Sequence, residues 1–286
     1  MAALTYLVIG HVTQDVADGS FVLGGTATYS AVTAARLGCR VRVLTAAAPS
    51  VAPALEELTR PGDLVLVESA KSTVFHNVYT PRGREQRLLS VATPLAPAHL
   101  PAGWRHPDIA HLGPVAREVS EEFTGVFPRL TTLGLTPQGW LRTWDHEGRV
   151  GPTRWMPAPA RLARAQALVL SQEDVGNETD LIGYYARHCP VTVVTRGYRG
   201  CTLYLRGAAH HLDTREAKEV DPTGAGDVFA AAFFIRLHET GDPFAAAGFG
   251  NAAGSMSVEG PGISAIPSRE QVEAWLERQR LPYAGR

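Results

Sequence analysis

The residues best suited to chemistry lie in one block of seven, from Asp221 to Asp227, which runs directly into an apolar segment with helical character. Three small residues, Gly224, Ala225 and Gly226, stand at the expected helix start. Their backbone N–H groups are bare, and the helix dipole adds partial positive charge there, so the block predicts an anion-binding site. Asp227 is then placed beside a bound phosphoryl group, where a carboxylate takes a proton from an attacking hydroxyl. A glycine-rich turn with a helix-capping carboxylate is the alternative interpretation.

Two further groups of residues suit the binding of a substrate. Gly24 and Gly25 precede an expected helix at 27–37, and two glycines at such a position let a substrate approach the backbone closely. Gln138 and Arg142 follow an expected strand at 132–136 and bring an amide and a guanidinium within reach of a substrate. A surface loop without a binding role is the alternative for this second pair.

The elements that must hold these residues alternate along the chain. Apolar stretches rich in Val, Leu and Ile alternate with longer helical patterns, which is typical of βαβ units around a mostly parallel sheet. The expected strands cover residues 4–9, 41–44, 109–112, 132–136, 167–170, 191–195 and 202–205. The expected helices cover residues 27–37, 118–130, 178–188, 226–238, 243–258 and 268–279.

Two segments, at about residues 11–22 and 64–90, do not follow this rhythm and contain short strand patterns joined by turns. We expect them to form a small antiparallel sheet that acts as a lid over a substrate. An edge extension of the main sheet with no function is the alternative. The chain has no internal repeat and no Ser/Gly-rich linker, so we expect one α/β domain over residues 1–286.

The composition argues against several classes of function. The 286 residues include 27 Lys+Arg and 28 Asp+Glu, a net charge of −1, so no basic field is present to hold a nucleic acid or an anionic membrane. No apolar run approaches the roughly 20 residues of a membrane-spanning helix. The three cysteines are scattered without a C-x-x-C pair, and no secretory signal pattern is visible, so we expect a cytoplasmic protein. The phosphate-binding motif of P-loop kinases does not occur either.

The block that ends at Asp227 resembles the C-terminal signature of the ribokinase-like sugar and nucleoside kinases, the PfkB family, and the resemblance runs through nearly the whole chain. The resemblance implies a doubly wound, mostly parallel α/β sheet flanked by helices, with a small β lid. It implies ATP and Mg²⁺ as cofactors. In that family the last Asp of the motif is the catalytic base and the preceding small residues form the anion hole, which agrees with the roles inferred above.

On the acceptor side, the resemblance implies that a Gly-Gly pair and an upstream Asp hold the hydroxyls of the acceptor. These family positions match Gly24, Gly25 and Asp15. Tyr29 stands where many members of the family carry Asn, which disfavours ribose as the acceptor. Residues 136–142, with Gln138 and Arg142, resemble a stretch of the inositol-kinase-like branch. A cyclitol such as myo-inositol is therefore the preferred acceptor.

On the donor side, the residues that the resemblance assigns to ATP are Thr195, Gly197, Gly200 and Asn251. The metal-associated Asn-x-x-Glu of the family is replaced here by Ser171-Gln172-Glu173-Asp174. A carboxylate survives, so Asp174 or Glu173 is expected to hold Mg²⁺ through water. The Pro261-Gly262 pair resembles the loop near a monovalent cation such as K⁺.

These inferences predict an ATP-dependent kinase that phosphorylates a hydroxyl of a polyol, sugar or nucleoside with Asp227 as general base, without nucleic-acid or membrane partners; a homodimer is left open. The second hypothesis is a non-catalytic ligand-binding descendant whose altered 171–174 motif no longer supports turnover. The third is a nucleotide-binding oxidoreductase, which would need G-x-G-x-x-G after the first strand; Gly10-His11-Val12 breaks that motif.

Overall fold

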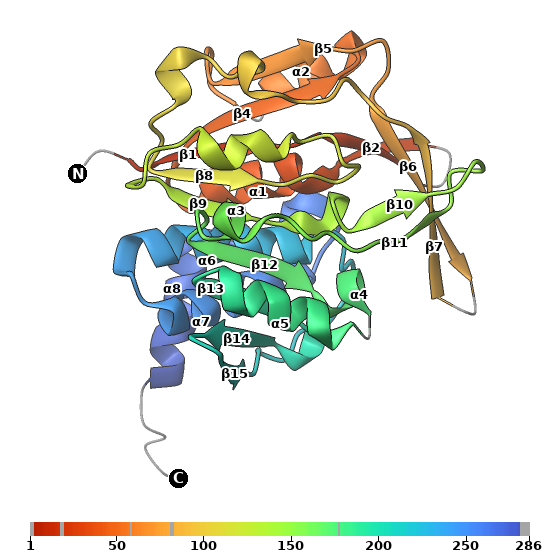
Figure 1. Ribbon diagram of the computed structural model, residues 1–286. Helices are drawn as coiled ribbons and strands as arrows, with labels where there is room; N and C mark the ends of the chain where they lie inside the picture. The colour runs from red at the N-terminus through yellow and green to blue at the C-terminus, as the bar shows by residue number, and fades with distance from the viewer. Residues whose placement is uncertain (1–2, 18–19, 58, 81–82, 177, 281–286) are drawn as a thin grey trace.

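The centre of the molecule is a nine-stranded sheet in the order β15-β14-β13-β12-β9-β8-β1-β4-β5 (Figure 1). The computed structural model describes residues 3–17, 20–57, 59–80, 83–176 and 178–280. The strands of this sheet are β1 (Thr5–Ile9), β4 (Arg40–Ala47), β5 (Leu64–Glu68), β8 (Ile109–Leu112), β9 (Thr132–Leu135), β12 (Ala167–Ser171), β13 (Val191–Thr195), β14 (Cys201–Leu205) and β15 (Ala208–Leu212). The pairs from β5 to β13 are parallel, whereas β14 and β15 are added antiparallel at one edge.

Helices cover both faces of the sheet, which is why its central strands are buried and mostly apolar. One face packs against α1 (Gly25–Arg36), α6 (Ala225–Thr240), α7 (Pro243–Ser257) and α8 (Arg269–Arg280). The other face packs against α3 (Pro159–Leu162) and α5 (Thr179–His188). The short helices are α2 (Ala52–Glu56) and α4 (Gln172–Val175). The expected doubly wound α/β fold is confirmed.

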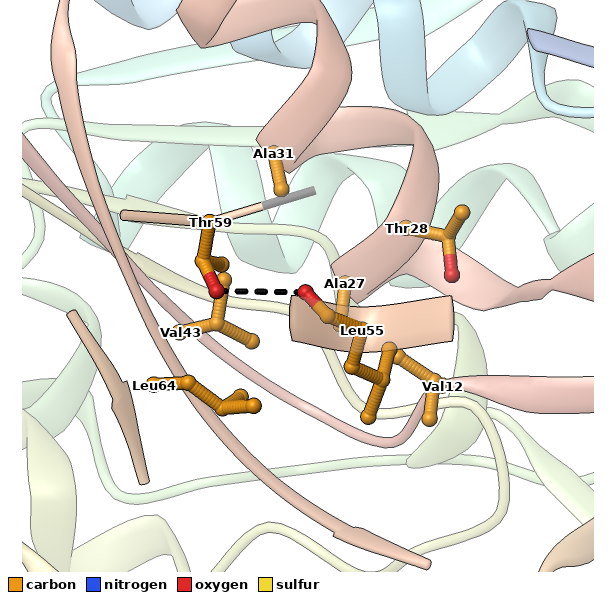
Figure 2. Close-up of a pocket in the computed structure, with 8 residues that line it drawn as sticks. All are labelled: Val12, Ala27, Thr28, Ala31, Val43, Leu55, Thr59 and Leu64. Atoms are coloured by element: carbon orange, nitrogen blue, oxygen red, sulfur yellow. Dashed lines mark hydrogen bonds between the residues drawn. The ribbon is translucent and has the colours of Figure 1, made fainter. Parts of the chain in front are cut away.

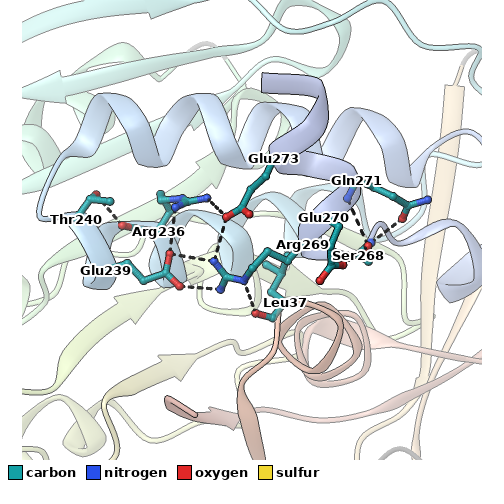
Figure 3. A network of polar contacts seen from close by, with 9 residues as sticks. All are labelled: Leu37, Arg236, Glu239, Thr240, Ser268, Arg269, Glu270, Gln271 and Glu273. Atoms are coloured by element: carbon teal, nitrogen blue, oxygen red, sulfur yellow. Dashed lines mark hydrogen bonds and ion pairs between the residues drawn. The ribbon is translucent and has the colours of Figure 1, made fainter. Parts of the chain in front are cut away.

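Helix α6 is buried on nearly all sides, because residues 228–235 are all buried. A helix that is apolar all round belongs in the interior, and this one packs between α1 and α7. A polar network then fastens the outer helix α8 to it (Figure 3). Arg269 pairs with Glu239 at 2.7 Å and donates from Nε to the carbonyl of Leu37 at 2.8 Å, while Arg236 pairs with Glu273 at 2.8 Å. The block that ends at Asp227 therefore leads into a helix that is held in place by packing and by ion pairs.

The segments expected to form a lid, and called the lid here after that expectation, build a four-stranded sheet in the order β3-β2-β6-β7 at the carboxyl ends of the main strands (Figure 1). The sheet is mixed and not wholly antiparallel, because β2 pairs in parallel with β6. Its strands are β2 (Thr13–Ala17), β3 (Ser20–Gly24), β6 (Thr73–Thr80) and β7 (Gly83–Ser90). Residues 18–19 and 81–82 of the expected lid segments lie outside the described part of the chain. A second small sheet, a hairpin of β10 (Arg142–Trp144) and β11 (Val150–Pro152), lies next to the lid.

Two expectations about the elements are wrong. Residues 64–67, assigned to the lid, form β5 at the edge of the main sheet, because they pair in parallel with β4 in the register Val43↔Leu64. The helix expected at 118–130 is only a short 3₁₀ turn at Glu121–Gly125. The segment before it is irregular because the Glu118 carboxylate accepts bonds from loop amides, and Arg117 adopts a φ of 60°. Within the described residues no helix is long and apolar enough to cross a membrane.

Candidate active site

The anion loop, residues 222–226, turns sharply into α6. Gly224 has a φ of 77°, in the left-handed region that favours glycine. A Cβ at Gly224 would lie 2.2 Å from the ring of Tyr29, so this ring packs directly against the loop. No side chain caps the start of α6, and of the three small residues only Ala225 has an amide committed to a turn, at 3.2 Å from the Pro222 carbonyl. An uncapped helix start can offer amide donors to an anion, and the binding of an anion here stays a prediction.

Asp227 lies in the first turn of α6 and is half-buried. Burial raises the pKa of this carboxyl to about 6, while a hydrogen bond from Thr26 and the positive charge of Arg142 act in the opposite direction. The negative charge of Asp174 adds to the rise. A carboxylate with a pKa near neutrality and next to an anion loop is well matched to general-base work.

Asp221 fastens the anion loop to the C-terminal part of the chain. One of its carboxylate oxygens accepts from the Thr223 amide at 2.9 Å, and the other accepts from the Gly262 amide at 2.9 Å. Partial burial works against ionisation, but the bonds from Thr223 and Gly262 keep the pKa of Asp221 below its usual value. The loop of residues 261–262, expected to lie near a monovalent cation, is thus held directly against the anion loop.

The acceptor-side residues come together where the lid meets α1. Asp15, on β2, accepts a hydrogen bond from the Thr13 hydroxyl at 3.1 Å. A Cβ on Gly24 would lie 2.8 Å from an oxygen of Asp15, and Gly25 has a φ of 84°. The Gly-Gly pair is therefore required by this close packing. Burial is the main cause of the raised pKa of Tyr29, and the negative charges of Asp221, Asp227 and Asp15 add to the rise. The charge of Asp15 therefore acts on the same ring as the charges beside the anion loop.

Gln138 and Asp174 contact each other across two loops. The Gln138 side-chain amide donates to Oδ1 of Asp174 at 3.3 Å, and the Ser171 backbone amide donates to Oδ2 at 2.9 Å. The second bond belongs to a capping box at the start of α4. Burial raises the pKa of the Asp174 carboxyl, while Arg142 lowers it. Asp174 thus has a helix-capping role at the position where the sequence suggested a water-mediated metal contact.

The residues present fit a metal ion only in a limited way. Among the described residues no group of three or more His, Cys, Asp or Glu is arranged to hold a metal. Mg²⁺ in phosphoryl-transfer sites keeps several waters and takes one or two carboxylates plus phosphate oxygens. Glu173 is exposed and offers such a carboxylate. This donor set fits an ion that is held mainly by the phosphates of a substrate.

A polar cavity of about 420 Å³ lies at the carboxyl ends of β12 and β13, and its lining residues do not include Thr195, Gly197, Gly200 or Asn251, which the sequence assigned to the donor. Arg196 and Arg199 line it together with Glu173. Nε of Arg196 is buried and has no hydrogen-bond partner in the described part of the chain. Two guanidiniums in one cavity suit a polyphosphate, because the fork of an arginine matches phosphate oxygens.

The turn that carries these arginines requires its glycines. Gly197 has a φ of 58° and Gly200 a φ of 78°, and the carbonyl of Gly200 accepts from the Arg196 amide at 2.8 Å. The Thr195 hydroxyl donates to the Leu170 carbonyl at 3.4 Å. Thr195, Gly197 and Gly200 thus shape the turn beside the cavity.

Asn251 lies apart from this turn, on α7. Its side-chain nitrogen donates to the carbonyls of Leu212 at 3.3 Å and Asp213 at 3.1 Å, so it fastens the end of β15 to α7. That nitrogen is committed to the fold, and a contact between Asn251 and adenine stays a prediction.

Sequence reasoning missed two residues near the site, Glu118 and Phe75, because neither belongs to a recognisable motif. Glu118 is buried and accepts from the amides of His11 at 3.0 Å and Ala116 at 2.7 Å. It joins the loops that follow β1 and β8, but one acidic residue in a loop has no distinguishing pattern. Phe75, on the lid strand β6, lies 5.6 Å from the Arg142 guanidinium, a contact between segments far apart in the chain. The small apolar cavity between α1, β4 and β5 (Figure 2) holds only about 10 Å³ and is no substrate site.

Residues 164–270 match the model of the pfkB family carbohydrate kinases. Among curated proteins, inositol 3-kinase of Zea mays is 34% identical over 211 residues, 69% of this chain and 54% of that protein. Ribokinase of Staphylococcus aureus is 32% identical over 136 residues, 41% of this chain and 45% of that protein. The chain thus spans about half the length of these curated relatives.

Solved structures with the same architecture cover nearly the whole chain. A pyrophosphate-dependent kinase in the ribokinase family, complexed with a pyrophosphate analog and myo-inositol, aligns with a TM-score of 0.77 at 23% identity, over 94% of this chain and 99% of that chain. Arabidopsis thaliana ribokinase, complexed with ribose and ATP, aligns with a TM-score of 0.73 at 16% identity, over 96% of this chain and 99% of that chain. Such likenesses identify the fold.

Proposed function

We propose that this chain, which has the ribokinase fold and matches the pfkB family carbohydrate kinases over its second half, is a kinase that phosphorylates a hydroxyl of a small polyol or sugar. The observation that carries the proposal is the anion loop that ends in the Asp227 carboxyl, whose pKa is raised to about 6. A base of that pKa beside a phosphate site is what alcohol phosphorylation needs, because the alcohol must lose its proton as the P–O bond forms.

In the proposed reaction the acceptor hydroxyl lies between Asp15 and Asp227. Asp15 accepts hydrogen bonds from neighbouring hydroxyls and orients the ring, and Asp227 accepts the proton of the attacking oxygen. The free amides at the start of α6 bind oxygens of the transferring phosphoryl group, where its charge is stabilised without rearrangement of solvent. Mg²⁺, when bound through the donor phosphates and Glu173, neutralises phosphate charge.

We infer that ATP is the phosphoryl donor, with its phosphates against Arg196, Arg199 and the anion loop. Pyrophosphate is the second candidate donor. A solved structure of the same fold is that of a pyrophosphate-dependent kinase. The cavity here offers two guanidiniums, whereas the Asn251 amide nitrogen is committed to backbone carbonyls. ATP and pyrophosphate have only their phosphate groups in common, so a cavity that binds phosphates suits either donor.

A cyclitol is the proposed acceptor class, with myo-inositol as its simplest example. Two features support it: the similarity to proteins named inositol 3-kinase, and Tyr29, whose ring occupies the position where Asn would offer an amide. The buried ring packs against Gly224, so this position supports the anion loop and offers no side-chain amide to ribose. Gln138 and Asp15 remain as polar groups for hydroxyls of a ring.

The test is a matrix of donors against acceptors, with phosphate products followed by ³¹P NMR. ATP and pyrophosphate are each combined with Mg²⁺ and with myo-inositol, ribose, fructose and adenosine. Product should form with at least one cyclic polyol and not with donor alone. Asp227→Asn serves as the control, because it keeps the loop amides and removes the base. If no pair gives product while calorimetry detects binding of donor and acceptor, the chain is a non-catalytic binding protein and the proposal is wrong.

A further inference from the structure

The side chain of His11 joins the segments through which the chain enters and leaves the lid. His11 is fully buried in the segment between β1 and β2. Nδ1 of its ring lies 2.7 Å from the hydroxyl of Thr73, the first residue of β6, and Nε2 lies 2.9 Å from the carbonyl oxygen of Thr93, in the segment after β7. One ring therefore connects the chain before β2, the start of β6 and the chain after β7. We call His11, Thr73 and Thr93 the lid junction.

The chemistry of the partners fixes the direction of each bond in the lid junction. A carbonyl oxygen only accepts, so Nε2 of His11 carries the proton and donates to Thr93. In the neutral ring Nδ1 then accepts, and the Thr73 hydroxyl donates to it. The Thr73 oxygen in turn accepts from the Ala92 amide at 3.0 Å. Every polar atom of these two side chains has a partner, so removal of the Thr73 hydroxyl leaves buried polar groups unpaired.

The backbone around His11 is held by the main sheet. The His11 amide donates to the buried Glu118 carboxylate at 3.0 Å, and the next amide, of Val12, donates to the Thr45 hydroxyl on β4 at 2.9 Å. The carbonyl of His11 lies against Gly25, where an added Cβ would come within 2.6 Å of that oxygen. This segment is therefore fixed to the main sheet through its backbone and to the lid through the His11 ring.

The lid junction lies at the start of the strand that carries Asp15. Strands β2 and β6 are parallel, with Thr13 opposite Thr73. Because Thr73 is bonded to the His11 ring, the register of this strand pair is set at its first residues. Asp15, two residues further along β2, then lies where the Thr13 hydroxyl donates to it at 3.1 Å and where a Cβ on Gly24 would meet its carboxylate. A shift of β6 against the main sheet would move β2, and with it the Asp15 carboxylate.

We propose that His11 and Thr73 are positioning residues for the acceptor, because they hold the lid in the register that places Asp15 against Gly24. This inference deepens the proposed function and rests on it where Asp15 binds an acceptor. Both side chains are buried, so they act through β2 and β6 and not by contact with a ligand. The arginine-lined cavity is built from residues after β9. Disruption of the lid junction should therefore weaken acceptor binding and leave donor binding intact.

The experiment compares Thr73→Val with Thr73→Ser and with Thr131→Val. Valine keeps the shape of threonine without the hydroxyl, whereas serine keeps the hydroxyl. Thr131 is the matched control, because its buried hydroxyl donates to the Pro107 carbonyl at 2.7 Å just before the amino end of β9, whereas the lid stands at the carboxyl ends of the strands.

Steady-state kinetics on the best donor–acceptor pair give the first readout. Thr73→Val should raise the acceptor KM about five- to thirty-fold and change the donor KM less than about twofold. Thr73→Ser should keep the acceptor KM within about threefold of the wild type, because its hydroxyl still bonds to His11. Thr131→Val should lower Tm without a change in either KM, since a stability loss alone does not move Asp15.

Hydrogen–deuterium exchange gives a second readout that needs no turnover. In Thr73→Val the amides of β2 and β6 should exchange roughly tenfold faster, while those of β12 and β13 keep wild-type rates. Unchanged exchange in β2 and β6, or a wild-type acceptor KM in an active Thr73→Val, overturns the proposal, as does a rise in acceptor KM that Thr73→Ser shares in full. If the wild type turns over no donor–acceptor pair, the proposed function is wrong, whereas faster exchange in Thr73→Val still supports the lid junction and unchanged exchange still overturns it.

Discussion

The raised pKa of Asp227 makes opposite predictions for activity and for stability, and both can be tested with one substitution. Asp227→Asn is nearly isosteric and keeps an oxygen that can accept from Thr26. It cannot take a proton at neutral pH. The backbone amides of the anion loop are untouched, so donor affinity should be retained.

For activity, the loss should be on the order of a hundred- to ten-thousand-fold in kcat, the usual contribution of a positioned general base. The wild type should also lose activity in acid. With a pKa of about 6, the ionised fraction is about 90% at pH 7 and about 10% at pH 5, so kcat/KM should fall roughly tenfold between them. Asp227→Asn should show no such step.

For stability, the sign is set by the direction of the shift. The pKa of Asp227 is higher in the folded protein than the ordinary value of 3.8, so the folded state binds the proton more tightly than the unfolded state. Stability is therefore full below about pH 4 and is lost as pH rises through about 6. A rise of about two units corresponds to about 3 kcal/mol at most. Asp227→Asn should raise the free energy of unfolding at pH 7 by up to that amount and change it little at pH 4.

The assays are pH–rate profiles of both proteins and urea unfolding of both at pH 4 and pH 7. Taking the difference in unfolding free energy between variant and wild type at each pH removes the contribution of other titrating groups. The reasoning is refuted if kcat of the variant stays within tenfold of the wild type, or if the wild-type rate is flat from pH 7 to pH 5. A variant that is less stable at both pH values would identify Asp227 as a helix-start residue with a structural role.

Four other outcomes are expected. Asp15→Ala should raise the acceptor KM roughly ten- to a hundred-fold and leave the donor KM nearly unchanged, as for the loss of charged hydrogen bonds; equal effects would place Asp15 outside the acceptor pocket. Gly224→Ala should lower Tm, because a Cβ meets the Tyr29 ring, whereas Gly226→Ala, with nothing within 4 Å of the added methyl, should keep Tm in the same thermal scan. Cyclic polyols should be phosphorylated faster than ribose at equal concentration, and a preference for ribose contradicts the role of Tyr29. Chelation of Mg²⁺ by EDTA should abolish turnover, and its readdition should restore it.

Local signals explain why the sequence predicts the turn and the helix start at Asp227. The small residues before Asp227 and the apolar run after it act within one helical turn, so the loop and the start of α6 can be predicted together, while the roles of these residues in catalysis stay predictions. The main strands are equally clear, because burial on both faces favours short runs rich in β-branched and apolar residues, such as residues 191–195. No contact with a distant segment is needed for either inference.

The errors and omissions concern features that depend on distant partners. Residues 64–68 have the pattern of a half-buried strand, and only the pairing with β4 decides that they extend the main sheet. Strands β10 and β11 have three residues each, too few for a pattern. The hydrogen bonds of Glu118 join loops about 100 residues apart in the chain, and those of Asn251 reach a strand 39 residues away. Side-chain roles of this kind become visible only in three dimensions.

The lid and the residues around Asp227 come from different parts of the chain, so the acceptor side and the phosphate side can be redesigned separately. The lid is made from residues between β1 and α1 and between β5 and β8, whereas Asp227, the anion loop and the arginine-lined cavity come from residues after β9. Lid strands can change in length or side chains without altering the register of the main sheet. Grafting of lid segments from proteins with other acceptors is therefore a practical route to new substrates, and the β10–β11 hairpin must be exchanged with them because Gly148 and Leu88 join the two.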